Sequence, residues 1–129
     1  MTDIRFTGGE PLLRPGLVEI VARAAALAPR PHLALTTNGY FLPGRARGLK
    51  EAGLDRITIS LDSLKPAVFK RMTGVDVLDR VMEGVEAAKR AHLTPIKVNA
   101  VIVRGHNEEE VADFAAFARE HGVWMRFIE

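Results

Sequence analysis

Residues 4–11, which read IRFTGGEP, decide the fold expected of this chain. Residues 4–7 alternate apolar and polar side chains, as a short β-strand does, and Gly8-Gly9 ends that strand in a tight turn. Two glycines allow the backbone to pass close to a ligand and leave N–H groups free. The Glu10 carboxylate is able to accept from an ammonium group. Taken alone, the turn is equally compatible with an ordinary connection between a strand and a helix.

Similar strand-like segments recur along the chain, each short, rich in branched or bulky residues and bounded by Gly, Pro, Asn or Asp. They are residues 33–37, 56–61, 96–103 and 123–128. Helical spacing fills the intervals, at residues 15–27, 44–52, 65–72, 77–91 and 108–120. Alternation of strands and helices at this length predicts the α/β class, with about five parallel strands, right-handed crossovers and one domain.

Several residues are expected to begin or end these helices. Pro15 suits the start of the first helix, and Ser63 and Asn107 are candidate N-caps of the third and fifth. Gly53 suits the C-cap of the second. The acidic run at residues 108–110 is expected to form a solvent-exposed first turn, since carboxylates there complement the helix dipole.

The predicted strands carry one apolar and one polar face, whereas strands of a parallel sheet usually bury both. The polar set comprises Arg5, Thr7, Ala34, Thr36, Asn38, Thr58, Ser60, Asp62, Lys97, Asn99 and Arg126. Unpaired charges are too costly for a dry core, so this face lines either a wet, ligand-filled cavity or open solvent. Its bases, Arg5, Lys97 and Arg126, suit an anionic ligand. Trp124 is expected to serve in packing.

Composition excludes several kinds of site. The chain has 129 residues, no cysteine and a formal net charge of +2. It therefore provides no disulfide, no thiolate nucleophile and no cysteine ligand for zinc or an iron–sulfur cluster. The scattered bases do not indicate a nucleic-acid partner. No long apolar run or targeting segment is recognisable, so we expect no membrane partner and a cytoplasmic location. The four histidines show no metal-ligand spacing.

Read together, the strand ends resemble the middle of a radical SAM enzyme. The resemblance lies in five segments, residues 5–12, 35–39, 59–63, 96–99 and 126–129. Among radical SAM enzymes, the GTP 3′,8-cyclases of molybdenum cofactor biosynthesis are the most similar, because of Lys97-Val98-Asn99 and the final Arg-Phe-Ile-Glu. The Gly-Gly-Glu-Pro turn itself is shared by many members of the superfamily.

The resemblance implies a partial (βα) TIM-like barrel with outer helices, whose lumen holds S-adenosylmethionine (SAM) and GTP. It implies SAM contacts at Gly8, Gly9, Glu10 and Ser60. It implies GTP contacts at Arg5, Thr36 and Lys97, all three of which also belong to the polar face. No role follows for Asn38, Asp62, Asn99, Arg126 or Glu129.

The resemblance also implies two [4Fe–4S] clusters whose cysteines would precede residue 4 and follow residue 129. Residues 1–129 are therefore expected to be the central part of a radical SAM barrel domain, inactive alone. Its exposed sheet edges would favour self-association. Two alternatives stay open: another radical SAM enzyme, such as a peptide-maturing one, and a non-catalytic nucleotide-binding domain.

Overall fold

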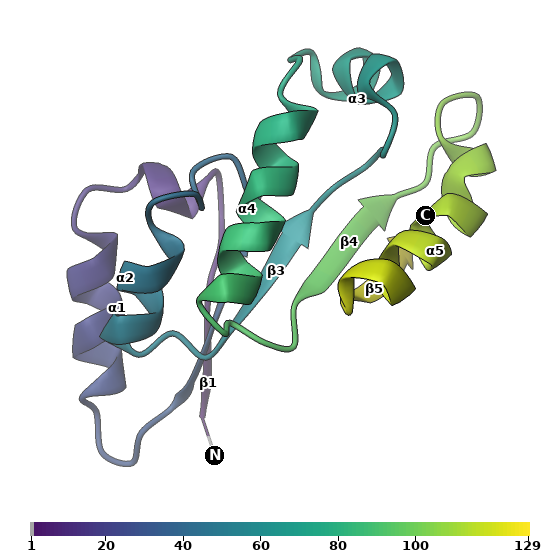
Figure 1. The fold of residues 1–129 in the computed structure, drawn as a ribbon. Coiled ribbons are helices and arrows are strands. Elements are labelled where there is room, and N and C mark those ends of the chain that lie inside the picture. The colour runs from purple at the N-terminus through teal and green to yellow at the C-terminus, as the bar shows by residue number, and fades with distance from the viewer. Residues whose placement is uncertain (1) are drawn as a thin grey trace.

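The computed structural model describes residues 2–129 and contains a single sheet of five parallel strands in the order β1-β2-β3-β4-β5. The strands are β1 Asp3–Phe6, β2 His32–Thr37, β3 Arg56–Ser60, β4 Lys97–Val101 and β5 Trp124–Ile128. The helices are α1 Leu17–Ala25, α2 Ala46–Ala52, α3 Pro66–Thr73, α4 Leu78–Arg90 and α5 Val111–His121, with 3₁₀ turns η1 at Pro11–Leu13 and η2 at Glu108–Glu110. Each strand lies beside the next one in sequence, as expected of successive βα units (Figure 1).

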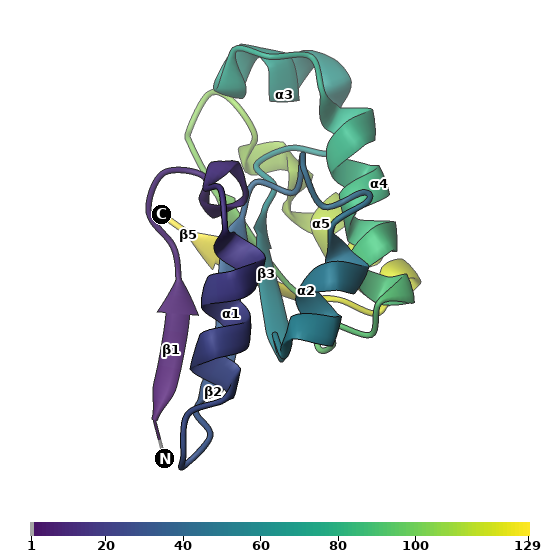
Figure 2. The ribbon, with the colours of Figure 1, turned by 90° about the vertical axis from the view of Figure 1, so that its left-hand side faces the viewer.

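Helices α1, α2, α4 and α5 lie along one face of a curved sheet, whereas α3 lies beyond the carboxyl ends of the strands (Figures 1 and 2). Strands β1 and β5 form the two edges of the sheet. The covered face is the apolar one, because Leu33 and Leu35 of β2 and Ile57 and Ile59 of β3 are almost completely buried. Within the described residues, the opposite face carries no helix (Figure 2). The expected α/β partial barrel, with outer helices, is therefore confirmed. Within residues 2–129 no helix is both long and apolar enough to cross a membrane.

The first helix begins later than predicted. Pro11, rather than Pro15, begins a helical turn, and that turn is the short η1. The α1 helix starts only at Leu17, after Gly16 adopts a left-handed conformation with φ of 78°. The predicted helix at residues 15–27 is therefore shorter at both ends, and the 3₁₀ turn lies before it. Gly53, by contrast, is confirmed as the C-cap of α2, with φ of 116°.

Asn107 occupies the predicted N-cap position, before η2, but its side chain makes no capping hydrogen bond, and Ser63 lies two residues before the cap position of α3. Asn107 is 1% exposed, and its side-chain amide donates to the carbonyls of Asp62 and Val101. Its Oδ1 accepts from the Val103 N–H, so the side chain joins the ends of β3 and β4 instead of capping a helix. The cap position of α3 is Lys65, whose N–H donates to the Ser63 hydroxyl oxygen.

The acidic run before α5 is not wholly solvent-exposed, as it was expected to be. Glu110 is 1% exposed, and its carboxylate accepts from the Ser63 hydroxyl at 2.7 Å and the Leu64 N–H at 2.8 Å. Glu108 and Glu109 remain exposed. Residues that look equivalent in sequence differ because only Glu110 faces the loop that follows β3.

Candidate functional site

One row of side chains crosses the uncovered face of the sheet at mid-height. Parallel register aligns Thr36 of β2 with Thr58 of β3, Thr58 with Lys97 of β4, and Lys97 with Trp124 of β5. The Arg5 guanidinium reaches this row from β1 and donates to Thr36 Oγ1 at 3.2 Å. The structure therefore brings Arg5, Thr36 and Lys97 onto one face, as predicted from strand parity. Cations and a hydroxyl so arranged suit an anionic ligand with directional acceptors.

Two residues of this face escaped the sequence reasoning. Trp124 was expected to serve in packing, yet it is 62% exposed and ends the row beside Lys97. Arg56 lies two positions before Thr58 on β3 and shares its face. Both occupy the first position of a strand, where the alternation is easily missed. Alternate residues of a strand share a face, so counting back from Ser60 places Arg56 on the polar face, and counting back from Arg126 places Trp124 there.

A second row lies nearer the carboxyl ends of the strands. It contains Ser60, Asn99 and Arg126, aligned across β3, β4 and β5. Ser60 is exposed and borders a cavity of about 490 Å³ at the ends of β2 and β3. The polar lining comes from Asn38, Ser60, Asp62, Tyr40 and Thr73, and the apolar lining from Phe41, Phe69, Val75, Val77 and Val81. Ligands of open α/β sheets bind beyond this end of the strands.

The Gly-Gly-Glu turn closes the carboxyl end of β1. Gly8 and Gly9 adopt positive φ of 86° and 27°, and no atom lies within 4 Å of where a side chain would begin at either position. Their backbone therefore stands open beside a hollow of about 500 Å³, which Arg5 and Arg14 also line. An accessible backbone of this kind is what close approach of a ligand requires.

Glu10 is already occupied by groups of the protein. Its carboxylate accepts from the Leu12 N–H, from the Thr37 hydroxyl at 2.8 and 2.9 Å, and from the Asn38 N–H at 2.7 Å. These bonds fasten the glycine turn to the end of β2. In this arrangement Glu10 fixes the shape of the turn, a function that spacing in the sequence did not indicate.

The acids of the open face lie at its two ends. Asp3 is near His32 at the start of the sheet, with 3.8 Å between Oδ1 and Nδ1. At the other end, Asp62 Oδ1 accepts from the Val101 N–H at 2.9 Å. The middle rows between them hold only basic and neutral side chains in the described strands. This part of the face therefore attracts anions.

The carboxyl groups with lowered pKa values lie elsewhere. Burial raises the pKa of Asp55, but the Leu33 N–H and the Arg30 guanidinium outweigh it and leave the pKa below the usual value. Burial likewise raises the pKa of Glu86, and His121 and Lys89 reverse that effect. Asp55 precedes β3, and Glu86 lies on α4 beside α5. Neither carboxylate belongs to the open face.

The site differs in its fit to the two cofactors that a radical SAM enzyme uses. The open glycine backbone and the exposed Ser60 fit SAM, which needs backbone and hydroxyl partners. A [4Fe–4S] cluster needs thiolate ligands, and the sequence contains no cysteine. Within residues 2–129 no group of three or more histidine or acidic side chains is placed to hold a metal ion. The residues present therefore do not fit a cluster.

Comparison with protein families assigns the class. The family model described as the radical SAM superfamily matches residues 2–118, which is most of the chain. This chain belongs to the radical SAM superfamily.

Curated relatives point to one group within that superfamily. The chain is 57% identical over 127 residues to GTP 3′,8-cyclase from Streptomyces coelicolor, a match that covers 98% of this chain and 37% of the relative. It is 51% identical over 129 residues to GTP 3′,8-cyclase 2 from Mycobacterium bovis, covering 100% of this chain and 36% of the relative. The chain thus spans little more than a third of the length of these relatives.

Solved structures share the fold at low sequence identity. Coproporphyrinogen III oxidase from Escherichia coli, a radical SAM enzyme, matches 98% of this chain and 31% of its own with a TM-score of 0.74 and 11% identity. Native anSMEcpe with bound AdoMet matches 96% of this chain and 36% of its own, with a TM-score of 0.73 and 20% identity. These likenesses support the partial barrel.

Proposed function

We propose that this chain forms the central part of the barrel of a GTP 3′,8-cyclase. Such an enzyme uses a SAM-derived 5′-deoxyadenosyl radical to convert GTP to (8S)-3′,8-cyclo-7,8-dihydroguanosine 5′-triphosphate in molybdenum cofactor biosynthesis. The observation that carries the proposal is the meeting of Arg5, Thr36 and Lys97 on one uncovered face. High identity to relatives of that name supports it. The proposed location is the cytoplasm.

The proposed GTP contacts are Arg5, Thr36 and Lys97. Guanidinium and ammonium groups bind phosphate or purine acceptors through charge-assisted hydrogen bonds, and a threonine hydroxyl adds direction. Because Arg5 already donates to Thr36, a ligand acceptor placed between Thr36 and Lys97 would meet all three groups. No acidic side chain of the described strands stands in that row to compete for the cations.

The proposed SAM contacts are Gly8, Gly9, Glu10 and Ser60. The two glycines, which follow β1, offer open backbone to the aminoacyl end of SAM. Ser60 offers a hydroxyl at the end of β3. Glu10 contributes through the turn that it fastens to β2 and through whatever acceptor capacity remains on its carboxylate.

Residues 1–129 alone are proposed not to cleave SAM. Cleavage needs an electron from a cluster, and the chain has no cysteine to hold one. The test is to incubate the chain with iron, sulfide, dithionite and SAM and to assay 5′-deoxyadenosine. Appreciable turnover would contradict this statement.

Nucleotide binding tests the GTP proposal. GTP is titrated into the complete gene product that carries residues 1–129, with ATP as a competitor. We expect Lys97→Ala to weaken GTP binding by about 10- to 100-fold, because one hydrogen bond to a charged group is worth about 1.5–3 kcal/mol. Lys50→Ala is the matched control, since Lys50 is exposed on α2.

The two alternatives give different results in the same preparation. Absence of GTP binding, together with 5′-deoxyadenosine formation after cluster reconstitution, would indicate a radical SAM enzyme with another substrate. GTP binding without any 5′-deoxyadenosine would indicate a non-catalytic nucleotide-binding domain. GTP binding that Lys97→Ala leaves unchanged would contradict the proposed site.

A further inference from the structure

A third row of the open face lies below the row of Thr36 and Lys97. Register aligns Arg5 of β1 with Ala34 of β2, and Ala34 with Arg56 of β3. Two arginines therefore stand on either side of the smallest side chain in that row. Neighbouring strands are about 4.8 Å apart, so the two arginine backbones lie about 10 Å apart. That span leaves the surface above Ala34 free of a long side chain, between two strands that each carry an arginine.

Arg56 faces the same side as the proposed GTP contacts. Its neighbours Ile57 and Ile59 are 1% and 0% exposed against the helices, so alternation turns Arg56 and Thr58 to the uncovered face. Thr58 is the register partner of Lys97, which makes Arg56 the diagonal neighbour of Lys97. Arg5, Arg56 and Lys97 thus surround one area of the sheet.

The side chain of Arg56 has no structural partner to explain it. Among the side-chain hydrogen bonds and ion pairs found within residues 2–129, none involves its guanidinium, and Arg56 is only partly buried. Arg5, by comparison, is oriented by Thr36. Asp55, the acid next to Arg56 in sequence, is engaged by Arg30 and the Leu33 N–H. The Arg56 guanidinium is therefore free to bind an anion that reaches this face.

We propose that Arg56 is a further phosphate-binding residue, which holds the polyphosphate chain of the nucleotide together with Arg5 and Lys97. The identity of the nucleotide rests on the proposed function. That an anion binds here rests on the strand register, which does not depend on that function. Arginine suits the position because its planar fork donates two parallel hydrogen bonds to one phosphate. Ala34 suits its position because any larger side chain would occupy the surface between the two strands that carry Arg5 and Arg56.

The experiment measures how the effect of Arg56 depends on phosphate. Wild type, Arg56→Ala and Arg56→Lys are prepared as the complete gene product and titrated with GTP, GMP, guanosine and inorganic tripolyphosphate. We expect Arg56→Ala to weaken GTP and tripolyphosphate binding by about 10- to 100-fold and guanosine binding by less than about two-fold. Arg56→Lys should recover part of the loss, because it keeps the charge and loses the fork.

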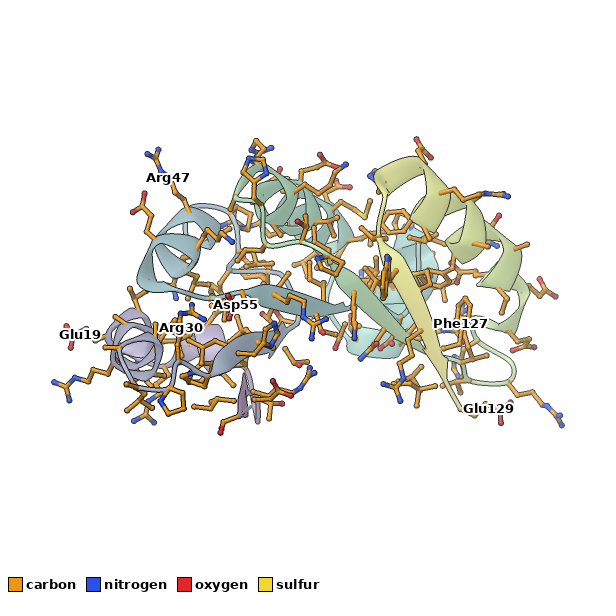
Figure 3. All side chains as sticks on the ribbon, turned by 90° about the horizontal axis from the view of Figure 1, so that it is seen from below. Glu19, Arg30, Arg47, Asp55, Phe127 and Glu129 are labelled. Carbon is orange, nitrogen blue, oxygen red and sulfur yellow. The ribbon has the colours of Figure 1, made fainter. Side chains whose placement is uncertain are left out.

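Arg47→Ala is the matched control. It removes the same charge from α2, where the Arg47 side chain is 89% exposed and projects away from the sheet (Figure 3). We expect this variant to bind every ligand as wild type does. Circular dichroism of all variants checks that each is folded.

The possible failures are distinguishable. If wild type binds GTP and Arg56→Ala binds it equally well, the inference about Arg56 is overturned while the proposed function stands. Equal weakening of guanosine and GTP would also overturn it, because a structural role would affect both. If wild type binds tripolyphosphate through Arg56 but shows no preference for GTP, the proposed function fails and the anion site remains. If wild type binds neither, both are overturned.

Discussion

At the scale of single residues, the Asp55 carboxylate holds the lower end of the sheet together. One oxygen, Oδ2, accepts from the Leu33 N–H at 2.8 Å and from Arg30 Nη1 at 3.1 Å. Arg30 also donates to the Gly53 carbonyl, so the contact joins the segments before β2 and β3 (Figure 3). The candidate site depends indirectly on the Asp55 contacts, because they lie where the pairing of β2 with β3 begins. These two strands carry Thr36 and Arg56.

The pKa of Asp55 makes this contribution dependent on pH. Burial raises the pKa, but the Leu33 N–H and Arg30 together lower it by more than burial raises it. The folded pKa therefore lies below its ordinary value of 3.8. A carboxyl group with a lowered folded pKa stabilises the protein above its unfolded pKa and loses that effect as the pH falls through the folded pKa. We expect Asp55→Asn to reduce the free energy of unfolding by about 1 kcal/mol at neutral pH and by less at pH about 3.

Urea unfolding at the two pH values measures this difference. Glu51→Gln is the control, because Glu51 is paired with Arg47 on the surface of α2 and is 67% exposed. Such exposed pairs contribute little to stability. A loss for Asp55→Asn that is equal at both pH values would show that the charge is not responsible.

At the scale of elements, the α4 helix is seated on the loop that follows β2. A Cβ at Gly84, in the middle of α4, would lie 2.2 Å from the Gly39 carbonyl oxygen and 3.3 Å from Leu42 Cβ. Gly39 follows Asn38, whose N–H donates to Glu10. The absence of a side chain at Gly84 therefore lets a helix approach the same loop that anchors the Gly-Gly-Glu turn.

Replacing Gly84 tests this contact against helix propensity. Alanine favours a helix by about 1 kcal/mol over glycine, so propensity alone predicts that Gly84→Ala is stabilising. We expect the opposite, a loss of about 2 kcal/mol or more, because the backbone of Gly39 must move away. The midpoint and slope of urea unfolding measure the change.

Gly48→Ala is the matched control for that substitution. Gly48 lies within α2, has no positive φ and has no atom within 4 Å of an added Cβ. There the same substitution should stabilise the protein by about 0.5–1 kcal/mol. If the two substitutions change the free energy of unfolding by the same amount, the close approach of α4 to the loop does not explain the need for glycine at position 84.

At the scale of the whole molecule, the sheet has two unpaired edges within residues 2–129. The β1 strand pairs only with β2, and β5 pairs only with β4. The β5 edge strand also exposes apolar side chains, since Trp124 is 62% and Ile128 39% exposed. Phe127, which precedes Ile128, is labelled in Figure 3. Exposed strands of this kind present hydrogen-bonding groups to another chain.

We therefore expect residues 1–129, prepared alone, to self-associate as the concentration rises. Sedimentation velocity measures the association. Ile128→Lys should reduce it, because a charged side chain at an edge strand opposes pairing. Leu27→Lys is the control, since Leu27 is 55% exposed but follows α1, away from β5. A monomer at every concentration, with cooperative unfolding, would contradict the expectation.

Much of the architecture was predictable from sequence, because strand and helix periodicity are local properties. All five strands were predicted within a few residues, and the parity of Arg5, Thr36 and Lys97 placed them correctly on one face. Helix starts were less predictable. Asn107 and the residue at 110 look like an N-cap and a surface acid, but both are buried because a loop distant in sequence folds over them.

By itself the sequence determined the element order, the two faces of the sheet and the absence of any cysteine ligand. Those features follow from the types of neighbouring residues and need no knowledge of distant contacts. Tertiary structure alone decided that Glu10 is held by Thr37 and Asn38, and that Arg56 stands across Ala34 from Arg5. The reason is physical: register between strands separated by a whole helix is set by core packing, which no local pattern contains.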